Sequence, residues 1–168
     1  MEKAIEGLFW VNQKLQKAEK FCGCVCLGVL FVVMISNAAL RYCLKSGFNW
    51  SDELNQFLFV WMGFLAAAYT MGDDKHLNVT AFIGFLPESL RFIVRQMMNV
   101  IMLLFFAMYI SPLFDLLGQL AISNVMRIPL KYVYAILPFS FSCMCFHILC
   151  NMIRDTGQFI RRKREGGL

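Results

Sequence analysis

Residues 21–40 read FCGCVCLGVLFVVMISNAAL and contain no Asp, Glu, Lys or Arg. An α-helix of this length extends for about 30 Å, which matches the hydrocarbon core of a bilayer. Three further windows of similar length are also free of charge, and they span residues 54–72, 96–114 and 132–153. The chain is therefore predicted to be an all-α integral membrane protein with four transmembrane helices, at about residues 21–40, 50–71, 95–117 and 132–153.

The composition of the 168-residue chain excludes an ordinary soluble domain. Hydrophobic residues make up 59% of the chain and charged residues only 16%, whereas about a quarter of a typical globular domain is charged. Most of the seven cysteines lie within or beside the predicted spans, where we expect free thiols that behave as small apolar side chains. The expected organisation is a single four-helix membrane domain that covers residues 1–168.

The basic residues fall mainly on one side of the predicted topology. Four spans place both termini and the connection between spans two and three on the same side, and these segments hold 12 of the 16 Lys and Arg residues. Because basic residues concentrate in cytoplasmic segments, we predict that both termini are cytoplasmic, in a bacterial inner membrane. Residues 154–168 then form a basic cytoplasmic tail. Its Arg-Arg-Lys-Arg run at 161–164 is interpreted as an orientation signal beside anionic lipid, in preference to a nucleic-acid site.

The N-terminal segment 2–20 mixes apolar and charged residues at helical spacing. Its apolar side chains are Ile5, Leu8, Phe9, Val11, Leu15 and Ala18. This pattern predicts an amphipathic helix that lies in the membrane interface before the chain turns into the first span. Acidic residues in this segment argue against a cleaved signal peptide, so we expect it to be retained. In the fourth span, Pro138 is expected to bend the helix.

Catalysis or cofactor binding would need converging polar side chains, and the predicted spans offer few of them. Away from their ends, the spans contain no Asp, Glu, Lys or Arg except Asp115 near one boundary, which argues against a solute path through this chain alone. Helical rise places His76 and His147 about 16 Å apart in depth, too far for two ligands of one haem iron. We expect no catalytic residue, metal or cofactor. A small anchor subunit of a respiratory haem or quinone complex is the alternative.

The second predicted span carries small residues at helical spacing. Gly63 and Ala67 are four positions apart, a spacing that lets membrane helices approach closely. Two interpretations stay open, since this face can pack within the four-helix domain or against a partner. Interhelical hydrogen bonds are expected from the amide side chains of Asn37, Asn55, Gln56, Gln96, Asn99 and Asn151.

An ordered set of short motifs extends over residues 41–79. It comprises RY at 41–42, FNWSDEL at 48–54, FVWMGFLAAA at 59–68 and HLNV at 76–79. This order resembles the DctQ-type small membrane subunit of tripartite ATP-independent periplasmic (TRAP) transporters, and the likeness covers about residues 20–145. The length and the four-span plan are also similar to those of that family.

The resemblance implies a scaffold role. The small subunit of this family associates with a large membrane subunit of the DctM type, which carries the solute and sodium sites. A periplasmic binding protein of the DctP type delivers an acidic solute, typically a sialic acid or a C4-dicarboxylate. The chain is then expected to be a non-catalytic subunit that braces the moving part of a sodium-driven transporter.

The resemblance also singles out residues for contact with those partners. At the predicted outer surface, Arg41, Trp50 and the acidic pair Asp52 and Glu53 are expected to fix the first hairpin and to face the large subunit or the binding protein. The alternative is local: Arg41 pairs with Asp52 or Glu53, and Trp50 is a headgroup anchor. The full set of candidates for the partner interface is Arg41, Trp50, Asp52, Glu53, Trp61, Gly63, Ala67 and His76.

Overall fold

The computed structural model describes residues 2–73 and 87–165, and its elements are helical. The helices are α1 (Glu2–Leu44), α2 (Ser51–Gly72), α4 (Glu88–Gln119), α5 (Leu130–Tyr134) and α6 (Ile136–Glu165). Four stretches of helix are long and apolar enough to cross a membrane, and each overlaps one of the four predicted spans. The prediction of an all-α protein with four membrane-spanning helices is therefore confirmed.

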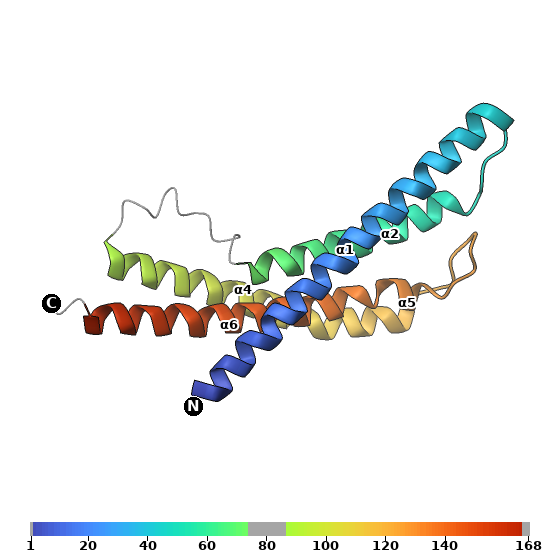
Figure 1. Ribbon diagram of the computed structural model, residues 1–168. Helices are drawn as coiled ribbons and strands as arrows, with labels where there is room; N and C mark the ends of the chain where they lie inside the picture. The colour runs from blue at the N-terminus through green and yellow to red at the C-terminus, as the bar shows by residue number, and fades with distance from the viewer. Residues whose placement is uncertain (1, 74–86, 166–168) are drawn as a thin grey trace.

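The long helices form two antiparallel pairs. α1 packs along α2, α4 packs along α6, and contacts between α2 and α6 join the pairs. Figure 1 shows α1 crossing α6 obliquely, while α4 and α6 lie side by side. The two termini lie toward one end of the bundle, called here the terminal end, and residues 45–50 and 120–129 connect helices at the opposite, loop end (Figure 1).

α1 is one continuous helix of 43 residues, so the turn expected near residue 20 does not occur. The reason lies in its packing face, which repeats at alternating steps of four and three residues. That face comprises Asn12, Gln16, Glu19, Gly23, Cys26, Leu30, Val33 and Asn37, all of them buried or half-buried. Such a repeat keeps one stripe of a helix against its neighbours. In the first half of α1 this stripe is polar, while Trp10, Val11 and Phe21 on other faces are exposed.

The fourth span is interrupted near its start, as the proline predicts. α5 ends at Tyr134 and α6 begins at Ile136. Pro138 has no N–H to donate to the carbonyl of Tyr134, four residues earlier, so the regular helical ladder cannot pass this point. Pro138 is itself buried. The expected bend of span four therefore takes the form of a break between two helices.

At the terminal end, α4 and α6 extend beyond the predicted spans. α4 begins at Glu88, directly after Pro87, and α6 continues through the basic segment to Glu165. The rings of Phe92 and Phe159 stack with centroids 4.3 Å apart.

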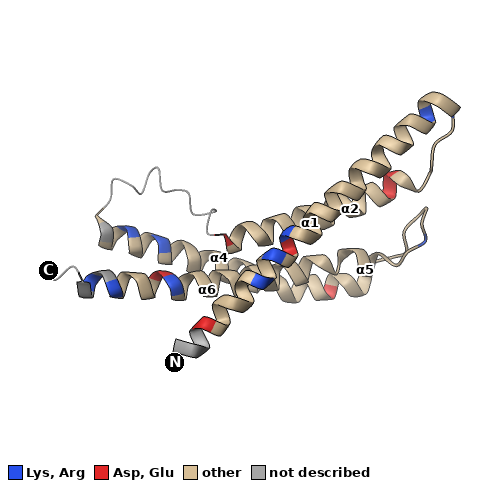
Figure 2. Ribbon diagram, in the orientation of Figure 1, with Lys and Arg blue, Asp and Glu red and all other residues tan. Residues whose placement is uncertain are grey.

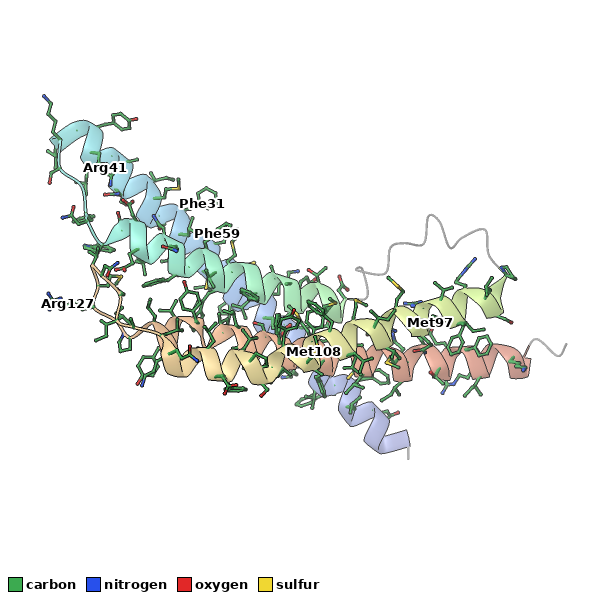
Figure 3. All side chains as sticks on the ribbon, turned by 180° about the vertical axis from the view of Figure 1, so that it is seen from behind. Phe31, Arg41, Phe59, Met97, Met108 and Arg127 are labelled. Carbon is green, nitrogen blue, oxygen red and sulfur yellow. The ribbon has the colours of Figure 1, made fainter. Side chains whose placement is uncertain are left out.

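A cluster of buried apolar residues sits where α2 meets α6. It consists of Ala68, Cys143 and Met144, with further apolar side chains packed around it. Most large apolar side chains instead lie on the surface, as for Phe31 and Phe59 on the first helix pair and Met97 and Met108 on α4 (Figure 3). Such a surface suits lipid or a membrane partner in place of water.

Candidate functional site

At the loop end, polar contacts fasten the connection between α1 and α2. The Arg41 guanidinium pairs with Asp52, with Nη2 and Oδ2 3.0 Å apart. The buried Asn37 accepts a hydrogen bond from the backbone N–H of Phe48, at 2.8 Å. The question of the Arg41 partner is thereby answered in favour of Asp52. Both side chains of the pair are more than half exposed, so the pair is accessible and contributes little to stability.

Glu53 points the other way, toward the loop of residues 120–129. Its Oε2 accepts a hydrogen bond from the backbone N–H of Met126 at 2.7 Å. The loop is closed on itself, since the N–H of Ser123 donates to the carbonyl of Ile128 at 2.9 Å and the N–H of Leu130 to the carbonyl of Ala121 at 3.1 Å. Glu53 therefore joins the first helix pair to the connection within the second.

We expect this contact to control access to the 120–129 loop, which carries the exposed Arg127. Glu53→Ala removes the acceptor of the Met126 N–H, so trypsin should cleave after Arg127 about fivefold faster. Glu53→Gln keeps an acceptor oxygen and should fall between that variant and the unmodified chain. Cleavage is followed by mass spectrometry on protein purified in detergent.

The neighbouring carboxylate supplies the control for this experiment. Asp52→Ala removes the contact with Arg41 and leaves Glu53 in place, so cleavage after Arg127 should keep its original rate. Equal rates in Glu53→Ala and in the unmodified chain would contradict the assigned role of Glu53.

The two tryptophans among the candidates are placed differently. The indole N–H of Trp61 in α2 donates to the carbonyl of Val133 in α5 at 2.8 Å, which is a second link between the helix pairs. Trp50 stacks on Phe48 with ring centroids 5.1 Å apart, and 40% of its surface is exposed. Trp61 is exposed to nearly the same extent, at 38%, so the two tryptophans differ in that Trp61 also links the helix pairs.

The small residues of α2 also differ in surroundings. Gly63 is exposed, and a Cβ at this position would meet no atom within 4 Å. Ala67 packs against the buried core beside Ala68. The small-residue face of α2 is thus open to the surface at Gly63 and packed against the core at Ala67. His76 lies outside the described residues, so its placement stays an expectation.

A second polar cluster lies nearer the terminal end, where α1 crosses α6. The His147 ring is fully buried, and its Nδ1 contacts Oδ1 of Asn12. Its Nε2 lies 3.1 Å from Oε2 of Glu19, whose side chain is 2% exposed. Each ring nitrogen of His147 thus faces a polar oxygen, an amide oxygen on one side and a carboxylate oxygen on the other.

Further contacts attach the end of α2 to the same place. Gln16 donates from Nε2 to the carbonyl of Gly72 at 2.9 Å, and Asn151 donates from Nδ2 to the carbonyl of Met71 at 2.9 Å. The last carbonyls of a helix lack partners within the helix and need such donors when they are buried. Three helices are joined here by side-chain hydrogen bonds.

Glu19 lies just outside the predicted span of residues 21–40, but it is buried within the same membrane-length helix of residues 6–44. The charge-free windows missed it because Glu19 sits just before residue 21. A usable signal was present, because Asn12, Gln16, Glu19 and Gly23 recur at one helical face. Glu19 and His147 are 128 positions apart, so no local sequence pattern predicts their contact.

These contacts stabilise the arrangement of helices and leave few polar groups that could bind a cofactor or metal. Both ring nitrogens of His147 are already bonded, so haem ligation by this residue would have to break one of those bonds. In residues 2–73 and 87–165, no three His, Cys, Asp or Glu side chains gather in a way that could hold a metal ion. Gln96 and Asn151 make the interhelical hydrogen bonds expected of amides. Asn37 instead accepts from Phe48 in the adjacent loop, and Oδ1 of Asn55 and Nδ2 of Asn99 have no protein partner in this structure.

Comparisons with known proteins identify the family to which this chain is similar. Residues 30–157 match the family of tripartite ATP-independent periplasmic transporters, DctQ component. Two Haemophilus influenzae proteins named as TRAP transporter small permease proteins are 28% and 30% identical over 46% and 56% of the chain. The matches cover 48% and 57% of those relatives, so the chain spans about half the length of the curated relatives it matches.

A longer relative is the sialic acid TRAP transporter permease protein SiaT of Haemophilus influenzae. It is 24% identical over 80% of this chain, and the match takes up 22% of SiaT. The resemblance drawn from the motifs of residues 41–79 is thereby confirmed, and the four apolar helices make the chain a multi-pass membrane protein. The chain belongs to the DctQ component family of tripartite ATP-independent periplasmic transporters.

Proposed function

We propose that this chain is the non-catalytic scaffold subunit of a sodium-driven TRAP transporter in a bacterial inner membrane, with both termini cytoplasmic. It works with a large membrane subunit and a periplasmic binding protein to take up an acidic organic solute of the sialic acid or C4-dicarboxylate class. The observation that carries the proposal is the family match over residues 30–157. Relatives named for C4-dicarboxylate and for sialic acid transport, both from Vibrio cholerae, support this solute class.

The internal contacts support a bracing role. The links Glu53 to Met126, Trp61 to Val133 and Glu19 to His147 each join one helix pair to the other. Intramembrane ionisable groups can also mark an ion path. Here the buried carboxylate of Glu19 contacts His147, which also contacts Asn12. Groups engaged in this way hold helices in place and do not form a row along which a solute could move.

The relative SiaT supports a large membrane partner. A region similar to this chain makes up about a fifth of that permease, so most of its length lies outside the match. We infer that the remaining machinery is supplied to this chain by a separate subunit. The apolar surfaces of both helix pairs are available for such a contact.

Among the candidate residues, we propose four for contact with partners. Arg41, Asp52 and Trp50 are exposed at the loop end, and Gly63 is open on α2. Glu53, Trp61 and Ala67 are engaged inside the chain, so their substitution would also disturb its own packing. His76 is retained as a candidate for contact at the cytoplasmic surface.

Reconstitution tests the proposed function. Liposomes that contain this chain, the large subunit and the binding protein should take up radiolabelled sialic acid or C4-dicarboxylate when an inward sodium gradient is imposed. Liposomes with this chain alone should show no uptake above empty vesicles. Uptake by this chain alone would overturn the proposal, as would full activity of the large subunit and binding protein without it.

An absorbance spectrum addresses the respiratory alternative. The purified chain should show no haem absorption in the visible range. A stoichiometric haem spectrum would instead favour an anchor subunit, and it would require the contacts of His147 to rearrange.

A further inference from the structure

The terminal end of the α4–α6 pair combines positive charge with exposed apolar side chains. Residues 88–95 and 154–165 together contain seven basic and three acidic residues. Figure 2 shows the basic bands of α4 and α6 side by side at this end. Leu90, Ile93 and Ile160 are about half exposed in the same turns. Water solvates the charges but not these apolar groups, so neither an aqueous surface nor a nucleic acid accounts for the combination.

The two helices are held together here, so the charges form one surface instead of a loose tail. Besides the stacked rings of Phe92 and Phe159, Arg95 pairs with Asp155 through Nε and Oδ2 at 2.9 Å. Gln96 donates from Nε2 to Oγ1 of Thr156 at 3.1 Å. These contacts engage Asp155 and fix the spacing between basic residues on α4 and on α6.

The position of the charges fits the headgroup layer. The charge-free stretch of α4 begins at residue 96 and that of α6 ends at residue 153. Arg91 therefore lies about 7 Å beyond the apolar stretch and Arg161 about 12 Å beyond it, measured along the helices. The headgroup region adds roughly 5 to 8 Å on each side of the hydrocarbon core, and long basic side chains reach back toward it.

We propose that the terminal end of α4 and α6 is a binding surface for anionic phospholipid, such as phosphatidylglycerol. Arg91, Arg161 and Lys163 contact the phosphate groups, and the exposed side chains of Leu90, Ile93 and Ile160 lie beside them at the level of the headgroups. Charge complementarity selects the anionic headgroup, and the exposed apolar groups select a lipid over a soluble anion. This surface is independent of the proposed transport role and would persist in the isolated chain.

Native mass spectrometry of the purified full chain, titrated with phosphatidylglycerol, tests this proposal. The triple variant Arg91→Gln, Arg161→Gln, Lys163→Gln should raise the apparent Kd at least about tenfold, since each cation near an anionic surface contributes a factor of about five. Phosphatidylcholine should bind much more weakly than phosphatidylglycerol to the unmodified chain. Inorganic phosphate at the same concentration should not compete.

A matched variant at the other end separates a local surface from total charge. The triple variant Lys45→Gln, Arg127→Gln, Lys131→Gln removes the same charge from the loop end and should leave the Kd for phosphatidylglycerol within about twofold. An equal loss in both triple variants would overturn the proposal, as would equal affinity for phosphatidylcholine.

A variant that changes no charge tests the role of the helix pair. Phe159→Ala removes the ring stack with Phe92, so the basic residues of α4 and α6 should lose their fixed spacing. We expect a weaker affinity for phosphatidylglycerol, with the helix content by circular dichroism unchanged. Unchanged affinity would show that the basic segment of α6 binds lipid without α4, which overturns the two-helix surface.

Discussion

His147→Leu should lower the free energy of unfolding of the purified chain by about 3–5 kcal/mol, because it leaves the carboxylate of Glu19 buried without a partner. The variant also removes the contact with Asn12. The first half of α1 should then separate from α6, since Asn12 and Glu19 are its hydrogen-bonding links to that helix. Unfolding by a denaturing detergent measures the free energy, and the rate of trypsin cleavage at Lys14 and Lys17 reports the separation.

The double variant Glu19→Leu, His147→Leu distinguishes a lost charge partner from a packing defect. Replacing a buried ion pair by apolar residues of similar volume is often neutral or stabilising, so the double variant should recover most of the stability. Full recovery is not expected, because Asn12 still lacks the ring nitrogen that it contacts. A double variant as unstable as the sum of the two single variants would show that Glu19 and His147 do not interact.

Sequence periodicity predicted the membrane helices but misjudged what each face of α1 does. Charge-free windows gave the four spans because helix length and bilayer thickness are simple constraints. The apolar positions of residues 2–20 were assigned to the interface, as for a helix on a membrane surface. In the structure the polar stripe of Asn12, Gln16 and Glu19 packs inward and Trp10 is exposed. Leu8, Phe9 and Leu15 are half-buried, and Leu15 packs against the core, so this half of α1 buries polar and apolar positions together.

The candidate site could be predicted only in part, because its contacts cross between helix pairs. Arg41 and Asp52 are 11 residues apart across a short turn, so a local pair was foreseeable. Glu53 and Met126 are 73 residues apart, and the bond uses a backbone N–H that any residue could offer. Sequence motifs thus identified Glu53 as important, whereas only the fold shows that it holds the 120–129 loop.

The exposed Gly63 offers the sharpest test of a partner-facing surface. A side chain there has room at its base, since a Cβ at this position would meet no atom of a neighbouring helix within 4 Å. In lipid such a change should be tolerated, because lipid chains adapt to a larger side chain. Against a closely packed membrane helix the same side chain would force the two helices apart. We therefore expect Gly63→Leu to leave the stability of the isolated chain unchanged and to reduce its recovery with the large subunit at least about tenfold.

Affinity purification through a tag on the large subunit, followed by quantification of this chain, measures that recovery. Gly118→Leu is the matched control, because Gly118 on α4 is also exposed and also has no atom within 4 Å of a Cβ. The control should be recovered at the normal level. Normal recovery of Gly63→Leu would place Gly63 in lipid and move the interface elsewhere, while instability of the isolated variant would mean that α2 packs within the chain at this point. Since Ala67, one turn further on, already packs against the core, the close approach of a partner would be centred between Gly63 and the loop end, where Trp50, Arg41 and Asp52 are exposed.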